Sequence, residues 1–118
     1  MGAQGRVDLV VAEDVVEEVL RVLRERFAEH PSLEEALEWL PRLLALYELV
    51  PRSRYADEIR RIAPLVRDAD AASVLACAIE AKVELLVSGD KDLLVLREVR
   101  GVRLSRTRDV LRALTDAE

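Results

Sequence analysis

The sequence has little of what cross-links or anchors many small proteins. Its single cysteine, Cys77, cannot form a disulfide within the chain, and no histidine cluster accompanies it to bind zinc. Apolar runs such as residues 9–12 and 43–47 are far shorter than the roughly 20 residues that cross a bilayer. Only 3% of the residues are aromatic, so the tryptophan and two tyrosines are expected in a core or an interface rather than stacked on bases. These absences predict a cytoplasmic protein with neither a signal peptide nor a membrane span.

The composition favours one folded domain. The chain has 118 residues, of which 51% are hydrophobic and 35% are charged. This apolar share is too high for a disordered chain, and the length is typical of a single domain. No repeat or flexible linker interrupts the sequence. We therefore expect a single domain over residues 1–118.

The formal net charge of −5 conceals an uneven distribution. Residues 1–59 carry 13 acidic and 7 basic residues, whereas residues 60–118 carry 10 acidic and 11 basic ones. Only Lys82 and Lys91 are lysines, so arginine supplies most of the positive charge. Six arginines lie within residues 97–112. They predict either a rim that binds phosphate groups or a solvated face, and the sequence leaves both open.

The apolar periodicity changes along the chain between strand and helix spacing. Runs at residues 7–11, 84–88 and 102–104 predict strands. Residues 43–50 could form a last helical turn followed by a short strand near residues 47–50, which periodicity alone does not decide. Helical spacing follows the first strand and returns over residues 54–63, 68–81 and 91–96, with a final helix capped by Ser105 or Thr107. Strands that alternate with helices predict a mainly parallel sheet covered on both faces.

A second helix is expected to begin at Ser32. The sequence Ser32-Leu-Glu-Glu35 matches a capping box, in which the serine oxygen accepts a backbone N–H and the glutamate reaches back to the cap. Pro41 is expected to end or kink this helix, because proline lacks the amide donor and clashes with the preceding turn.

Acidic residues lie where a parallel sheet commonly binds ligands. Such sites form beyond the carboxyl ends of the strands. Asp90 follows the strand at 84–88 directly, with Asp92 two residues later. Asp68 and Asp70 open the preceding helix, and Glu18 lies in the helix after the first strand. Carboxylates from three elements suit Mg²⁺, which can position a water for attack on a phosphodiester. Taken singly, each acid also fits a helix cap, a turn or a solvated face.

The order of these residues matches a known pattern. Five segments carry it, namely LVVAEDVVEE (9–18), VRDAD (66–70), VLACAI (74–79), LLVSGDKDLL (85–94) and RGVRLS (100–105). In this order the chain resembles the PIN-domain nucleases, in particular those that act as toxins of toxin–antitoxin systems. The resemblance covers nearly the whole chain, and LVSGDKDLL is its most specific portion.

The resemblance implies a ribonuclease that depends on Mg²⁺ or Mn²⁺ and has a three-layer α/β/α fold. It implies an RNA substrate, an antitoxin protein as partner and a homodimer. The family's acids fall on Glu18 and Asp90, with Asp92 beside the latter. The best register places another family aspartate at Ala71, with Asp68 and Asp70 nearby. The expected catalytic residues are Glu18, Asp70 and Asp90, and the expected metal ligands are Glu18, Asp68, Asp70, Asp90 and Asp92.

The chain departs from the family at its beginning. Members normally open with a central strand that ends in an aspartate, whereas residues 1–6 lead directly into what resembles the second strand. We therefore expect an N-terminally truncated fold. The strand at 7–11 would then pair with the one at 84–88, pair across a dimer, or pair with a segment upstream of Met1. The alternative function is an inactive PIN-like scaffold for dimerisation or antitoxin binding.

Overall fold

A computed structural model describes residues 8–116. The chain separates into two compact units, the first ending at Arg52 and the second beginning at Ser53. Each unit is described by itself, and a single domain over residues 1–118 stays a prediction. Val7, the expected start of the first strand, lies outside the described residues. Across the described part of the chain, no helix has the length and apolar character needed to cross a membrane.

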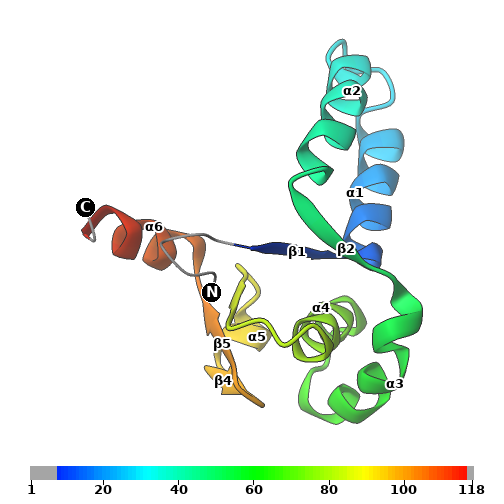
Figure 1. The fold of residues 1–118 in the computed structure, drawn as a ribbon. Coiled ribbons are helices and arrows are strands. Elements are labelled where there is room, and N and C mark those ends of the chain that lie inside the picture. The colour runs from blue at the N-terminus through cyan, green and yellow to red at the C-terminus, as the bar shows by residue number, and fades with distance from the viewer. Residues whose placement is uncertain (1–7, 117–118) are drawn as a thin grey trace. The chain divides into compact units, whose positions relative to one another are not determined.

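The first unit is a pair of parallel strands joined through two helices (Figure 1). Its elements are β1 (Leu9–Ala12), α1 (Glu13–Arg26), α2 (Leu33–Leu44) and β2 (Tyr47–Val50). Leu9 lies opposite Tyr47 and Ala12 opposite Val50 in the parallel register. Parallel strands need a long connection, which the two helices supply, and each helix contacts the strand next to it in the chain. The strand at 47–50 is thereby confirmed.

The first turn of α1 is tied to the residue after β2. Glu13 and Asp14 begin the helix, where acidic side chains interact favourably with its positive end. The backbone N–H of Arg52 donates to Glu13 Oε1 at 2.7 Å, and the guanidinium of Arg52 pairs with Asp14. These contacts join the start of α1 to the end of β2, next to the carboxyl ends of both strands.

Two details predicted for α2, the Ser32 cap and an end of the helix at Pro41, are wrong, and a kink at Pro41 stays a prediction. The helix begins after Ser32, but the serine side chain makes no capping hydrogen bond. Ser32 has φ −92° and ψ 5°, outside the extended region that capping needs, and its N–H donates to His30 Nδ1 at 3.1 Å. The helix also continues past Pro41 to Leu44, because the Pro41 carbonyl still accepts from Ala45 N at 3.0 Å.

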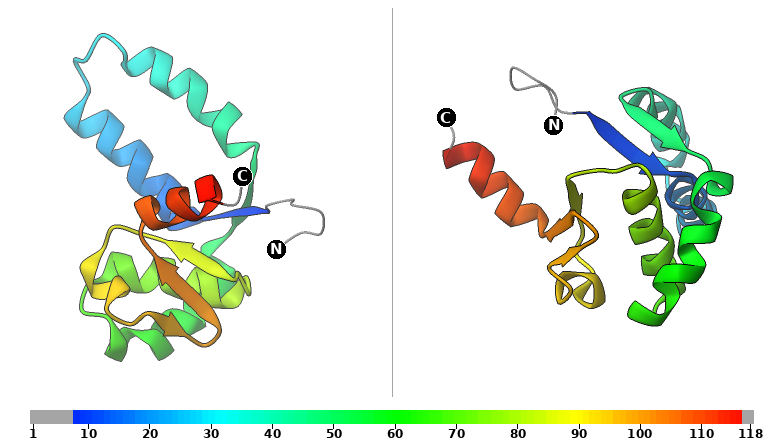
Figure 2. Two further views of the ribbon diagram at one scale, coloured as in Figure 1. Left: turned by 90° about the vertical axis from the view of Figure 1, so that its left-hand side faces the viewer. Right: turned by 60° about the horizontal axis from the view of Figure 1, so that its bottom comes forward.

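The second unit combines helices with a three-stranded sheet (Figures 1 and 2). The strand order is β3-β5-β4, with β3 parallel to β5 and β4 antiparallel to it. The sequence did not predict β4, which is two residues long. The elements in chain order are α3 (Arg52–Ile62), the 3-10 helix η2 (Ala63–Leu65), α4 (Ala69–Glu80), β3 (Leu85–Val87), α5 (Lys91–Leu94), β4 (Glu98–Val99), β5 (Val102–Ser105) and α6 (Thr107–Asp116).

A small core holds the second unit together around α4. Alanines on α4 let neighbouring elements approach closely, and Cys77 is buried on the same helix as expected of a small apolar residue. Leu86 of β3 and Leu104 of β5 pack against this core from the sheet. Tyr55 of α3 is fully buried. The core cluster consists of Ile62, Val66, Ala71, Ala72, Leu75 and Leu93.

A buried carboxylate links α3 to the turn between β4 and β5. Glu58 is buried and pairs with Arg61 at 2.8 Å and with Arg100. The hydrogen bond from Arg61 to Glu58 raises the pKa of this guanidinium. Arg100 (φ 48°) and Gly101 (φ 87°) form the two-residue turn, and positive φ at both positions is typical of a type I′ hairpin.

The structure differs from the single, mainly parallel sheet that the sequence predicts. The parallel pairing is confirmed, but the described residues form two small sheets instead of one. β1 pairs with β2 and β3 pairs with β5, so within residues 8–116 each of β1 and β3 has a strand partner along one edge only. Leu85 and Val87 on β3 are exposed. The three-layer arrangement stays a prediction.

Candidate functional site

Asp90 lies directly beyond the carboxyl end of β3, as the sequence predicts. Ser88 N–H donates to Ser105 O at 3.0 Å and so extends the pairing of β3 with β5 by one residue. The Ser88 hydroxyl accepts from Asp90 N at 3.0 Å, and Asp90 Oδ1 accepts from Asp92 N at 2.8 Å. Asp90 therefore caps α5, and its half-buried carboxylate is held in one orientation. Asp92 follows in the exposed first turn of α5.

Asp68 and Asp70 stand at the start of α4. Asp68 is the N-cap, and its Oδ2 accepts from Ala71 N at 3.3 Å. Asp70 lies in the first turn and is exposed. Both carboxylates lie near the positive end of the helix dipole. Helix α5 packs against α4, so the second unit carries two pairs of aspartates, each at the beginning of one of two helices in contact.

Removing the Asp68 cap is expected to weaken the second unit. Asp68→Ala leaves the Ala71 N–H without its side-chain acceptor and should lower the free energy of unfolding by about 1 kcal/mol. Asp68→Asn keeps a capping oxygen and should change it by much less. Urea denaturation followed by circular dichroism measures both. Equal losses in the two variants would show that the cap contributes little.

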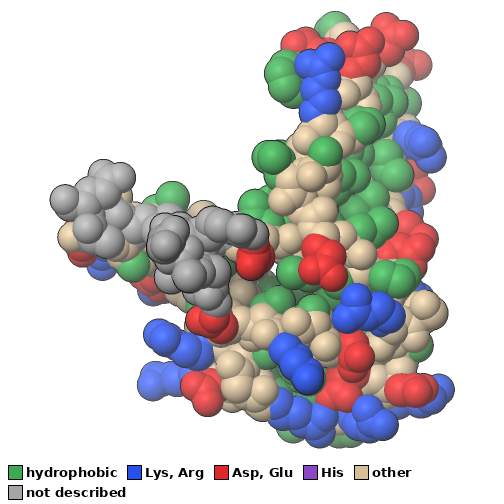
Figure 3. Space-filling model, in the orientation of Figure 1, with side chains coloured by type: hydrophobic (Ala, Val, Ile, Leu, Met, Phe, Trp, Pro, Cys, Tyr) green, Lys and Arg blue, Asp and Glu red, His purple; other side chains and the backbone are tan. Residues whose placement is uncertain are grey.

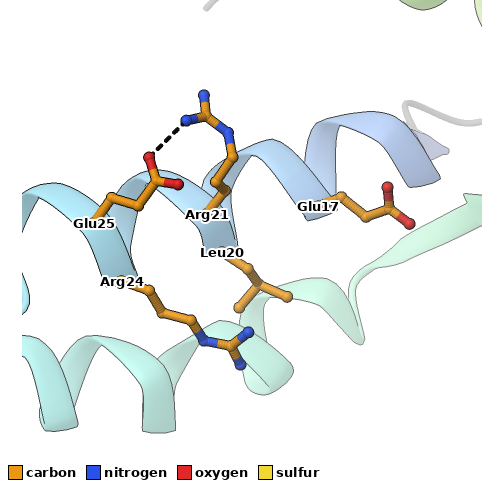
Figure 4. Close-up of a pocket in the computed structure, with 5 residues that line it drawn as sticks. All are labelled: Glu17, Leu20, Arg21, Arg24 and Glu25. Carbon is orange, nitrogen blue, oxygen red and sulfur yellow. Dashed lines mark hydrogen bonds and ion pairs between the residues drawn. The ribbon is translucent and has the colours of Figure 1, made fainter.

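Glu18 is placed in the first unit, on α1. It is half-buried, and its carboxylate pairs with Arg21. Arg21 also donates to Glu25 at 2.8 Å, which is the contact drawn in Figure 4. The hydrogen bond from Arg21 to Glu18 raises the pKa of the guanidinium. The spacing of three and four residues places these side chains together on one helix. This spacing is visible in the sequence as Glu18, Arg21 and Glu25. A shallow hollow beside the pair is lined by Glu17, Leu20, Arg21, Arg24 and Glu25 (Figure 4).

The five predicted acids therefore fall in two parts of the structure. Glu18 belongs to the first unit and the four aspartates belong to the second. Their oxygen donors are of the type that Mg²⁺ prefers. As arranged, however, no three Asp, Glu, His or Cys side chains among residues 8–116 gather as a group that could hold a metal ion. Glu18 is engaged by Arg21, and Asp68 and Asp90 accept backbone hydrogen bonds.

Arginines are exposed over the last third of the second unit. Figure 3 shows several Lys and Arg side chains over this unit. Arg106 pairs with Asp109 at 3.2 Å, and Arg100 pairs with the buried Glu58. Each of these two guanidinium groups therefore already has a carboxylate neighbour. Within residues 97–112 the exposed arginines are Arg97, Arg100, Arg103, Arg106, Arg108 and Arg112.

The chain was compared with known proteins. A family model described as PIN domain matches residues 1–92, about three quarters of the chain. No curated protein and no solved structure matches. The matched span contains all five predicted acids, whereas β4, β5 and α6 lie beyond it.

Proposed function

The chain belongs to the PIN-domain family, and from this premise we propose that it is a Mg²⁺- or Mn²⁺-dependent ribonuclease acting as the toxin of a toxin–antitoxin pair. PIN domains are typically nucleases. The observation that carries the proposal is the family match, which contains Glu18, Asp68, Asp70, Asp90 and Asp92. The place of Asp90 beyond the end of β3 supports it, because ligands of parallel sheets bind at that edge. We also propose that the chain forms a single three-layer domain and that it acts in the cytoplasm.

We assign catalysis to Glu18, Asp70 and Asp90, with Asp68 and Asp92 as further metal ligands. When bound, the ion would supply a polarised water and offset charge on the phosphate. Glu18 belongs to the first unit and the four aspartates to the second, and no group of three candidate ligands is found among residues 8–116. For catalysis, the Glu18 carboxylate would have to release Arg21 and bind the ion instead.

Arginine supports RNA as the substrate. Its planar guanidinium binds phosphate oxygens in pairs, and neutralising phosphates supplies most of the affinity of non-specific nucleic-acid binding. Arg103, Arg108 and Arg112 are exposed on β5 and α6. We propose that these arginines hold the RNA backbone, so that binding weakens steeply as the salt concentration rises.

A cleavage assay tests the proposal. The parent should cut an unstructured RNA in Mn²⁺ or Mg²⁺ and should leave it intact in EDTA. Glu18→Gln should lose this activity, because the amide is neutral and cannot replace a carboxylate ligand. Glu17→Gln, one residue away on α1 and exposed, is the matched control and should cut as the parent does. If the RNA stays intact with the parent in both Mn²⁺ and Mg²⁺, the proposal that the chain is a ribonuclease is contradicted.

The second candidate is an inactive PIN-like scaffold that binds an antitoxin or a second copy. One observation favours it, namely that the Glu18 carboxylate is engaged by Arg21 and the Asp68 and Asp90 carboxylates by backbone N–H groups. Calorimetric titration with Mn²⁺ separates the candidates. The scaffold predicts no binding together with intact RNA, whereas the nuclease predicts binding that weakens in Glu18→Gln.

A further inference from the structure

A carboxylate lies on the buried face of α3, where a helix normally places apolar side chains. Tyr55, Glu58 and Ile62 follow helical spacing, and all three are buried. A buried ion pair commonly stabilises a fold no more than apolar residues of the same size would, because removing charges from water is costly. Packing of the core therefore does not account for a charged side chain at position 58.

Glu58 brings together two arginines from distant parts of the chain. Its Oε2 accepts from Arg61 Nη1 at 2.8 Å, and its Oε1 accepts from Arg100 Nη1. Arg61 lies about one turn further along α3, whereas Arg100 lies in the turn between β4 and β5. Figure 1 shows the end of α3 and this turn at the lower end of the second unit. The two guanidinium groups would repel each other without the carboxylate between them.

Both arginines are open to solvent, although Glu58 is buried. The Arg61 side chain is 61% exposed and the Arg100 side chain 51%, against 6% for Glu58. Two positive charges meet one negative charge, so the cluster keeps a surplus of one positive charge. Among the described residues, each guanidinium group uses its Nη1 toward the carboxylate, which leaves the N–H donors on Nε and Nη2 for a second ligand.

The surroundings of this arginine pair favour an anionic ligand. Helix α3 carries four arginines and two acidic residues, and of these acids Asp57 pairs with Arg60 whereas Glu58 is buried. Arg100 is also fixed by the backbone, because its φ of 48° belongs to the tight turn that Gly101 completes. Side chains that are ordered before binding lose less conformational entropy when a ligand arrives, which raises the affinity.

We propose that Arg61 and Arg100, held together by Glu58, form a binding site for a phosphodiester of the RNA backbone. A planar guanidinium binds two phosphate oxygens at once. The surplus of one positive charge matches a phosphodiester, which carries one negative charge, better than a free phosphate group, which carries nearly two. The site rests on the proposed function for its ligand, RNA. It uses none of the five predicted acids and none of the three arginines proposed above to hold RNA.

Binding of a fluorescently labelled, unstructured oligoribonucleotide in EDTA tests this site in the absence of cleavage. Fluorescence anisotropy should show that Arg61→Gln and Arg100→Gln each weaken binding by the full chain about 3- to 10-fold. Each should also reduce the slope of log affinity against log salt concentration by about 0.7, as expected for one lost phosphate contact. Arg60→Gln removes the same charge from the neighbouring residue, whose partner is the exposed Asp57, and should weaken binding by less than about twofold.

Glu58→Gln separates an ordered site from general charge attraction. The substitution makes the protein more positive, so general attraction alone would strengthen RNA binding. The proposed site predicts weaker binding, because a neutral amide no longer holds both guanidinium groups. Arg61→Lys keeps the charge but lacks the planar fork, and it should also bind RNA more weakly than the parent. Circular dichroism confirms folding, and Arg61→Lys, which leaves Glu58 paired with Arg100, decides the question if Glu58→Gln does not fold.

Several results would overturn this site. They are a parent that does not bind the oligoribonucleotide, parent-like RNA affinity in both Arg61→Gln and Arg100→Gln, and tighter binding by folded Glu58→Gln. Variants that lose binding of inorganic phosphate yet bind RNA as the parent does would assign the site to a free anion instead. Failure of the proposed function looks different. RNA that binds the parent, binds the variants more weakly and stays uncut in Mn²⁺ and Mg²⁺ contradicts the ribonuclease but supports this site.

Discussion

Asp90→Asn is expected to abolish RNA cleavage while it leaves the fold intact. Asparagine retains a side-chain oxygen that can accept from Asp92 N, and it caps helices about as well as aspartate. What the substitution removes is the negative charge that a divalent ion needs. Loss of a residue that merely supports a metal ligand costs roughly 10- to 100-fold in activity. We expect a larger loss here, because the proposed function makes Asp90 a ligand itself.

Two comparisons separate catalysis from stability at this position. Asp90→Ala should lose both the activity and the cap, so its urea midpoint should fall below that of Asp90→Asn. Asp109→Asn on α6 removes a carboxylate of the same unit outside the predicted set and should leave cleavage unchanged. Full cleavage by Asp90→Asn in Mn²⁺ would remove Asp90 from the catalytic residues.

Leu75→Ala is expected to cost more stability than any other change considered. Leu75 on α4 is 0% exposed and belongs to the core of the second unit, together with Ile62 and Leu93. Its truncation removes buried methyl groups and leaves a cavity, which lowers the free energy of unfolding by about 3–5 kcal/mol. Small domains are stable by only about 5–15 kcal/mol, so a loss of this size should markedly raise the unfolded fraction of the second unit.

Leu65→Ala is the matched control, because it removes the same atoms from η2 in the same unit. Leu65 is 53% exposed, so its truncation leaves no enclosed cavity and should cost less than about 1 kcal/mol. Urea denaturation monitored by circular dichroism at 222 nm gives both free energies. Similar losses for the two variants would mean that the core around α4 is not closely packed.

Most elements could be predicted from local patterns. The β-branched run before Ala12, the alanine-rich helix after Asp68 and the break at Gly89-Asp90 each contain their own signal, and each element forms there within a few residues. The capping rule failed at Ser32, and Pro41 does not end its helix. Whether a serine caps depends on its backbone angles, and an interior proline removes one hydrogen bond without preventing the next turn.

Strand pairing could not be predicted in the same way. The sequences of β3 and β5 do not reveal which strand each one pairs with, because pairing joins segments that are not adjacent in the chain. The periodicity of β4 is invisible, since Glu98 and Val99 are too few to alternate. Its hairpin was nevertheless encoded by Arg100-Gly101, where a glycine permits the positive φ of the turn.

The candidate site was predicted in its parts. Position at the end of a strand and at the start of a helix identified Asp90 and Asp68, and the structure places both as helix caps. Position alone did not show that Arg21 engages Glu18, although their spacing would have. Nor did it show that Trp39 is exposed, because exposure depends on which helix face the rest of the fold covers.

The half-paired strands also bear on how the protein behaves when it is concentrated or partly unfolded. Strands β1 and β3 are apolar and contain no lysine or proline to discourage further pairing. When the chain is partly unfolded, an apolar strand edge of this kind templates the addition of strands from other molecules. Aggregation during overproduction or refolding should therefore begin at these two segments, and a lysine introduced at Val87 would act as a gatekeeper against it.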